Sequence, residues 1–298
     1  MRAVAGSTAG RGAGRGRWVW ALSGVATAAL LAVPITHAIT TAGDPPADVA
    51  YAQPAPVSTR TITVKQPVTS VTILSYGSPV QVTTGSVSHV EVTESFGFVN
   101  GPEPWPVSVT QTVSGGHLLL SDPQCAPAGP GCAVTFALTV PPGVAVTAVS
   151  DGGPISVSGV AGANLDSGGG TVSAAKIDGP LTVRTEGGPL LVDGLTGALN
   201  VDTGNAPFIA QGVDASIATV STDGGNARIA FTAPPDSVTV ATDGGTAFLT
   251  IPGGPYALTA DSDGGPETVR IPTNPAASRS LTVSTAGSPL WIAPASKG

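Results

Sequence analysis

Apolar and polar residues alternate at period two over much of the chain after residue 58, and from residue 144 this alternation recurs at a nearly constant interval. Each recurrence is centred on a Ser or Thr that precedes a Gly-rich turn, with apolar residues two and four places before it. The eight centres are Ser150, Ser167, Thr185, Thr203, Thr222, Thr242, Ser262 and Thr285, at intervals of 17, 18, 18, 19, 20, 20 and 23 residues. Alternation at period two is typical of a strand with one buried face. Each repeat is therefore predicted to contain a strand, a tight Gly corner, a second strand and a return loop. We expect Gly at the corner because the backbone needs a positive φ there and because neighbouring coils pass close together.

A single repeat has too few inward apolar side chains to offset the entropy lost on ordering it. Stacking equivalent strands would complete the backbone hydrogen bonds and build a continuous core. We therefore predict an all-β, parallel β-helix-like solenoid of about eight short coils over residues 144–293, with residues 17–23 apart lying over one another. An antiparallel meander is the alternative, because Asp-Gly also favours hairpin turns. It does not explain why strands of the same phase repeat the same inward pattern.

The regions outside these repeats are less regular. Residues 58–143 contain alternating strand candidates without a fixed period. They fit either a small sandwich-like region or irregular early coils of the same stack. Residues 41–57 are rich in Pro and Ala and are predicted to form an extended linker, and residues 294–298 form a short tail.

Charge divides the chain sharply. Residues 1–17 carry four arginines and no acid, and residues 18–40 carry no charge at all. Residues 18–40 are predicted to be a membrane anchor behind a basic cytoplasmic tail, or a signal peptide cleaved near 36–38. The anchor places the protein in the cell membrane as a single-pass protein with its C-terminal domain outside, and cleavage would make it a secreted protein. The residues after 43 carry a formal charge of −11, which argues against nucleic acid as a partner.

The two cysteines fit an exported protein. Cys125 and Cys132 flank a loop rich in Pro and Gly, and we predict that they form a disulfide in an oxidising compartment. Two free thiols are the alternative.

Little in the sequence indicates a chemical site. Asp223, Asp243 and Asp263 occupy the same turn position in consecutive repeats and are weak candidates for a calcium-binding column, although Asp also simply suits a turn. Asp151 and Glu186 occupy that position earlier in the chain. A Thr or Asn lies three places before every centre. This column is either a recognition face or a run of good exposed strand residues. No nucleophile, metal-protease or phosphate-loop motif occurs, so we expect no catalytic residues and no cofactor.

The run VTFALTVPPGVAVTAVSDGGPISVSGVAG at 134–162, with the later segments of the form LTVxTxGG, resembles the bacterial "putative adhesin" β-strand-repeat family, a domain of unknown function. The resemblance covers residues 60–293 approximately. It implies a right-handed β-helix-like stack, usually behind a single membrane segment at the bacterial surface, and no catalytic residues. The chain departs from the family pattern at 203–205 and 285–288, where the acidic turn residue is missing, and in the loop between Cys125 and Cys132.

We therefore expect a non-catalytic extracytoplasmic β-repeat protein that acts as a surface scaffold or adhesin-like binding module. Its Thr-rich faces would bind cell-wall glycan or another envelope component. The alternatives are an envelope-signalling accessory protein and a polysaccharide-active enzyme on a β-helix.

Overall fold

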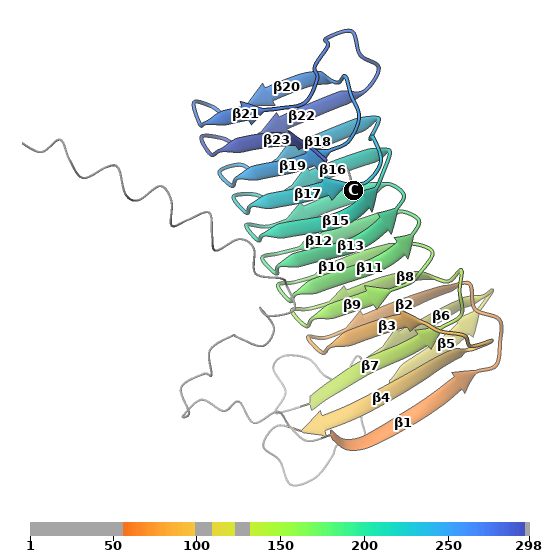
Figure 1. Cartoon of the computed structure of the whole chain (residues 1–298). Coiled ribbons are helices and arrows are strands. Elements are labelled where there is room, and N and C mark those ends of the chain that lie inside the picture. The colour runs from red at the N-terminus through yellow and green to blue at the C-terminus, as the bar shows by residue number, and fades with distance from the viewer. Residues whose placement is uncertain (1–55, 99–108, 123–131, 296–298) are drawn as a thin grey trace, which may run out of the picture. The chain divides into compact units, whose positions relative to one another are not determined.

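The computed structural model describes residues 56–98, 109–122 and 132–295, and every regular element in these ranges is a strand (Figure 1). The strands form two sheets, sheet A with twelve strands and sheet B with eleven. Sheet A runs in the spatial order β1 (Pro56–Val64), β4 (Val90–Phe98), β7 (Cys132–Val140), β3 (Val80–Thr84), β9 (Ile155–Ser158), β11 (Val172–Asp178), β13 (Leu190–Thr196), β15 (Phe208–Asp214), β17 (Ala227–Phe231), β19 (Ala247–Ile251), β23 (Leu290–Pro294) and β21 (Glu267–Val269). Sheet B runs in the order β20 (Ala257–Asp261), β22 (Ser280–Ser284), β18 (Ser237–Ala241), β16 (Ile217–Ser221), β14 (Leu199–Thr203), β12 (Leu181–Thr185), β10 (Ala163–Ser167), β8 (Ala145–Ser150), β2 (Ser70–Ser75), β6 (His117–Ser121) and β5 (Thr110–Ser114).

Parallel pairing dominates both sheets. Leu181 of β12 lies between Ala163 of β10 and Leu199 of β14, in the register that the repeats predict. Only the pairs β1–β4, β4–β7 and β5–β6 are antiparallel among the described strands. The all-β, mostly parallel, solenoid-like fold is therefore confirmed, and the antiparallel meander is wrong for the repeats.

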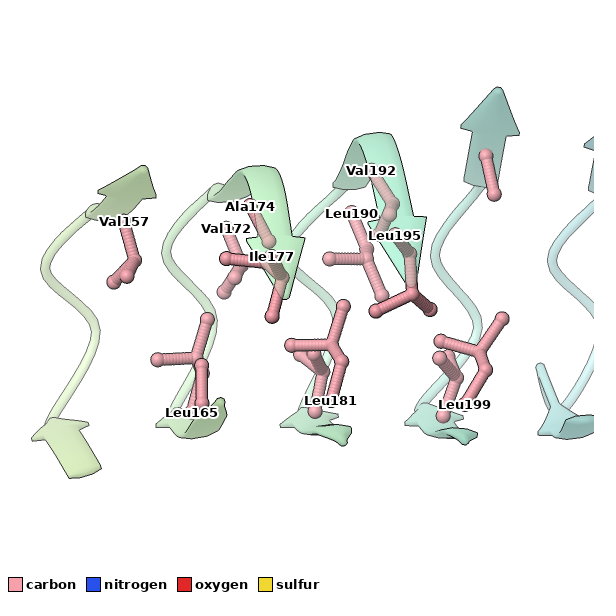
Figure 2. Packing of buried hydrophobic residues seen from close by; sticks show 14 of the residues in the cluster. Val157, Leu165, Val172, Ala174, Ile177, Leu181, Leu190, Val192, Leu195 and Leu199 are labelled. Carbon is pink, nitrogen blue, oxygen red and sulfur yellow. The ribbon is translucent and has the colours of Figure 1, made fainter. Parts of the chain in front are cut away.

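The core lies between the two sheets. Leu165, Leu181 and Leu199 point inward from sheet B toward Val172 and Leu190 of sheet A (Figure 2). All five are buried, as are nearly all the apolar positions that the repeat pattern assigns to the interior. In β20, at the end of sheet B, the inward Leu258 and Ala260 are only partly buried because this strand has a neighbour on one side alone.

A column of buried hydroxyl groups closes the corner between each sheet B strand and the sheet A strand that follows. The Ser or Thr at the centre of a repeat is buried, and in every repeat except the first its hydroxyl donates to the carbonyl oxygen three residues on; Ser150 donates to Ser78 O instead, at 3.5 Å. Thr185 donates to Gly188 O at 2.9 Å and Thr203 to Ala206 O at 3.0 Å. The same bond forms at Ser75, Ser167, Thr222, Thr242, Ser262 and Thr285. Each corner thus satisfies one of its carbonyl groups inside the core, where an unpaired group is costly.

Glycine at these corners follows from the close stacking of backbones. A Cβ added to Gly188 would lie 2.0 Å from the carbonyl oxygen of Gly170 in the preceding coil. The GG element of the repeat is therefore a packing requirement as much as a turn signal.

The last two repeats stack in the reverse of their chain order, which corrects the sequence-based prediction. β22 lies between β18 and β20 in sheet B, and β23 lies between β19 and β21 in sheet A (Figure 1). After β19 the chain leaves a gap one strand wide, forms β20 and β21 at the end of the stack, and returns to fill the gap with β22 and β23. The prediction that equivalent residues of successive repeats overlie one another is right up to Val238 and again for Leu258 and Leu281, and it is wrong only for the step from Val238 to Leu258, whose strands β18 and β20 are separated by β22.

The region before residue 144 joins the same two sheets. Val71 and Ile73 of β2 pair in parallel register with Val146 and Ala148 of β8. β3 pairs with β9 in the same way. Two interpretations of residues 58–143 were open, and the one that makes them early coils of the same stack is right for β2 and β3. The antiparallel strands β1, β4 and β5 lie at the outer end of the sheets.

Several sequence predictions fall outside the described residues. They concern the basic tail at 1–17, the membrane segment at 18–40, most of the linker at 41–57 and Cys125 of the disulfide, and they remain predictions. In the ranges that the structure describes, no helix is long and apolar enough to cross a membrane.

Candidate functional site

A row of large side chains crosses the outer face of sheet A. Leu191, Ile209, Arg228, Phe248 and Trp291 occupy the same outward position in β13, β15, β17, β19 and β23, and each is paired in register with the next. Neighbouring strands are about 4.8 Å apart, so the row is about 19 Å long. We call these five residues the aromatic row.

The aromatic end of the row is held together by two contacts. The guanidinium carbon of Arg228 lies 4.7 Å from the centre of the Phe248 ring, which is a cation–π contact. The Phe248 and Trp291 rings meet edge to face, with centres 5.9 Å apart and planes inclined at 62°. Trp291 is nevertheless 48% exposed. An apolar ring is therefore kept at the surface in a fixed position rather than folded into the core.

The reversed order of the last repeats creates this site. Trp291 lies beside Phe248 because β23 is inserted between β19 and β21. If the coils had stacked in chain order, Phe248 would have faced Thr268 of β21. Sequence reasoning did not single out the row. The sequence could have shown that Arg228 and Phe248 are neighbours, because each lies six residues after a repeat centre. It could not have shown that Trp291 lies beside Phe248, because that depends on the insertion of β23 between β19 and β21.

The column of Thr and Asn residues predicted on sheet B does face outward. Thr147, Asn164, Thr182, Asn200 and Thr219 follow one another in register on adjacent strands, and Thr239, Thr282 and Thr259 continue the column. The column itself contains no large side chain.

The three candidate calcium ligands are not consecutive in space. Asp263 belongs to the end of the stack, and the inserted coil, with Ala286 at the equivalent position, lies between it and Asp243. Asp223, Asp243 and Asp263 all have a positive φ, of 25°, 42° and 47°. Asp tolerates this conformation better than most residues, which gives the acids a structural role in the turn. Within the described residues no group of three His, Cys, Asp or Glu side chains could hold a metal ion.

Two buried carboxyl groups lie near the N-terminal end of the stack. Asp122 directly follows β6, at the corner position that a buried Ser or Thr occupies in the repeats. Its Oδ1 accepts a hydrogen bond from the Tyr76 backbone N–H at 3.1 Å. Burial raises its pKa to about 6, against the lowering effect of its backbone hydrogen bonds. Burial also raises the pKa of Glu94, and the charge of Arg60 opposes this rise. One oxygen of each carboxyl has no hydrogen-bond partner among the described residues.

Comparison with known proteins gives similar folds only. No family model matches the chain, and no curated protein matches it. A crystal structure described as a "putative adhesin" from Bacteroides fragilis is similar over 80% of this chain and 98% of its own, with 12% identity and a TM-score of 0.48. A "putative adhesin" from Parabacteroides distasonis covers 78% of this chain and 96% of its own at 12% identity and a TM-score of 0.43. A "putative cell adhesion protein" from Clostridium sporogenes is similar over 80% of this chain and 99% of its own, with 9% identity and a TM-score of 0.26.

These descriptions agree with the family that the sequence resembles. At such identities and TM-scores they carry no argument about what this chain binds, and the evidence for the fold remains the pairing of its own strands.

Proposed function

We propose that this chain is a non-catalytic binding module displayed outside the cell, and that it holds a glycan chain along the aromatic row of sheet A. The observation that carries the proposal is Trp291, a large ring kept half exposed at the end of a row in which four of the five side chains are apolar. Exposed apolar surface that is held in place, rather than scattered, marks interaction sites.

The shape and chemistry of the row favour a linear, uncharged or weakly charged partner. The row runs along the stacking direction of the coils, so an extended chain would meet Leu191, Ile209, Phe248 and Trp291 in succession. Ring faces and aliphatic side chains match the C–H faces of sugar rings, and Arg228 supplies hydrogen-bond donors to hydroxyl groups. The chain's formal charge of −7 disfavours polyanions.

Two parts of the proposal, display outside the cell and attachment to the membrane, are supported by the uncharged segment at residues 18–40. Mass spectrometry of the N-terminus of the natural protein would distinguish an anchor from a cleaved signal peptide. The right-handed winding and the number of about eight coils likewise remain part of the proposal, as does surface-scaffold or adhesin-like activity.

The proposal is tested by sedimenting the full chain with insoluble cell-wall glycan and measuring both the bound fraction and the release of reducing ends. Trp291→Ala is expected to weaken binding about tenfold or more, because large aromatic side chains contribute much of the affinity of many binding surfaces. Thr268→Ala, the next position of the same row on β21, is the matched control and should change binding less than twofold. Equal binding by both variants would refute the assignment of the row, and release of reducing ends would refute the non-catalytic reading.

A further inference from the structure

A second surface feature lies on the outer face of sheet B, on the sheet opposite the aromatic row. A depression of about 320 Å³ is bordered by Leu74, Tyr76, Val149, Asp151, Asp166 and Glu186. These residues belong to four adjacent coils, which begin with β2, β8, β10 and β12. We call it the sheet B depression.

The floor of the depression is apolar, whereas the next three coils carry charged side chains at the same outward position. Leu74 and Val149 are paired in register at the outward position just before the buried hydroxyl, and they are 36% and 38% exposed. In the following coils that position is occupied by Asp166, Arg184 and Asp202. Tyr76 adds an aromatic ring that is 44% exposed, and its backbone N–H is fixed by the buried Asp122.

The hollow results from a missing side chain. Asp151 and Glu186 occupy the corner position directly after the buried hydroxyl in their coils, and between them the same position is Gly168. A Cβ added to Gly168 would lie 3.2 Å from Asp151 Oδ1, so a side chain here would enter the space that the depression now offers.

The rim is mainly negative. Asp151, Asp166 and Glu186 are exposed carboxylates on three neighbouring coils: Asp151 and Glu186 follow the buried hydroxyl two coils apart, at about 10 Å, and Asp166 precedes the hydroxyl of the coil between them. Arg184 is paired in register with Asp166. The sole ion pair among the described residues joins Arg279 to Asp236 elsewhere on the surface. Three carboxylates and one guanidinium leave the rim a net charge of −2 (−3 + 1). Like charges at this spacing repel one another, and a bound cation would relieve that repulsion.

From the apolar floor and the negative rim we infer that the sheet B depression binds an extended peptide that carries lysine or arginine side chains. The methylene stem of such a side chain would lie on Leu74 and Val149, and its cationic end would reach the carboxylates, since long basic side chains bury their stems and keep their charge in water. Tyr76 offers a ring face to the same cation. A bare metal ion fits less well, because the carboxylates do not converge as metal ligands must.

The inference does not depend on the glycan proposal, which concerns sheet A. The test is a fluorescence anisotropy titration of the full chain with labelled penta-lysine, and with labelled penta-glutamine as the uncharged peptide. Binding to exposed carboxylates is weak per contact and screened by salt. Penta-lysine should therefore bind detectably at low ionic strength and lose affinity as NaCl is added, and penta-glutamine should not bind.

Two variants locate the site. Asp166→Asn with Glu186→Gln should weaken penta-lysine binding about fivefold or more. Gly168→Ser, which fills the hollow without changing the charge, should also weaken it. The matched control, Asp193→Asn with Asp214→Asn, removes the same number of exposed carboxylates from sheet A and should change the affinity less than twofold. An equal loss in the control, equal binding of penta-glutamine, or full competition by equimolar CaCl2 would each overturn the inference.

Discussion

The buried hydroxyl column provides a sharp test of how the coils are held together. Thr203 is fully buried, and its hydroxyl donates to Ala206 O at 3.0 Å within the corner between β14 and β15. Thr203→Val keeps the shape of the side chain but replaces the hydroxyl with a methyl group. The Ala206 carbonyl then loses a partner that no water can replace.

Leaving a buried acceptor unsatisfied costs about 1–3 kcal/mol. We therefore expect Thr203→Val to lower the free energy of unfolding by that amount. For a protein of this size each kcal/mol lowers the melting temperature by about 2–4 °C. Thr203→Ser should keep most of the stability, because serine makes the same bond at Ser167 and Ser262.

Thr219→Val is the matched control. Thr219 lies in the neighbouring strand β16 and faces solvent, so its replacement should change the free energy of unfolding by less than about 0.5 kcal/mol. Urea unfolding followed by circular dichroism measures all three variants. If Thr203→Val is as stable as Thr219→Val, the hydroxyl column does not support the corners and the reasoning fails.

Three further predictions concern single sites. The pKa of Asp122 is raised by burial from 3.8 to about 6, so the folded state holds its proton more tightly than the unfolded state and stability should fall as pH rises from about 4 to 6. At about 1.4 kcal/mol per pKa unit the loss is up to about 3 kcal/mol. Asp122→Asn, which keeps the oxygen that accepts the Tyr76 N–H, should reduce this pH dependence in urea unfolding, and an unchanged profile would contradict the assignment. Ala286 has a φ of 43°, which is unfavourable for a residue with a Cβ, so Ala286→Gly should raise the free energy of unfolding by about 1 kcal/mol, and a lower urea midpoint would contradict this. Cys125 and Cys132 should take up alkylating reagent only after reduction of the purified protein, whereas labelling of both without reductant would show free thiols.

The repeated alternation in the sequence was sufficient to predict the parallel stack. Inward positions such as Leu181 and Leu199 overlie one another because each coil must bury its apolar face against the next. Glycine at the corners was predicted for two reasons, a positive φ and the close passage of neighbouring coils. The close approach of Gly188 to the Gly170 carbonyl confirms the second reason.

The order of the last two coils was beyond this kind of reasoning. The strands around Leu258 and Leu281 have the same alternating pattern, so the pattern alone does not say which of them lies beside β18. The aromatic row was missed for the same reason, because Trp291 and Phe248 meet only through this insertion.

The depression on sheet B was missed for a different reason. Its hollow arises from one absent side chain, Gly168, in a column where glycine also serves the turns. Leu74 could not be aligned with Val149 from sequence, because 75 residues separate them and the region between has no regular period.

The insertion of the last coil is tested most directly by disulfide cross-linking in a chain that carries Cys125→Ser and Cys132→Ser. Ala241 and Ser284 are paired in register on the adjacent strands β18 and β22, whereas Asp261 lies one strand farther away on β20. Adjacent strands are about 4.8 Å apart, within the range that a disulfide spans, and strands two apart are about 10 Å apart, which exceeds it. Mild oxidation should therefore join Ala241→Cys to Ser284→Cys and leave Ala241→Cys with Asp261→Cys unjoined, as read by mass spectrometry of tryptic peptides. Cross-linking of the second pair and not of the first would mean that the coils stack in chain order, and would contradict the account.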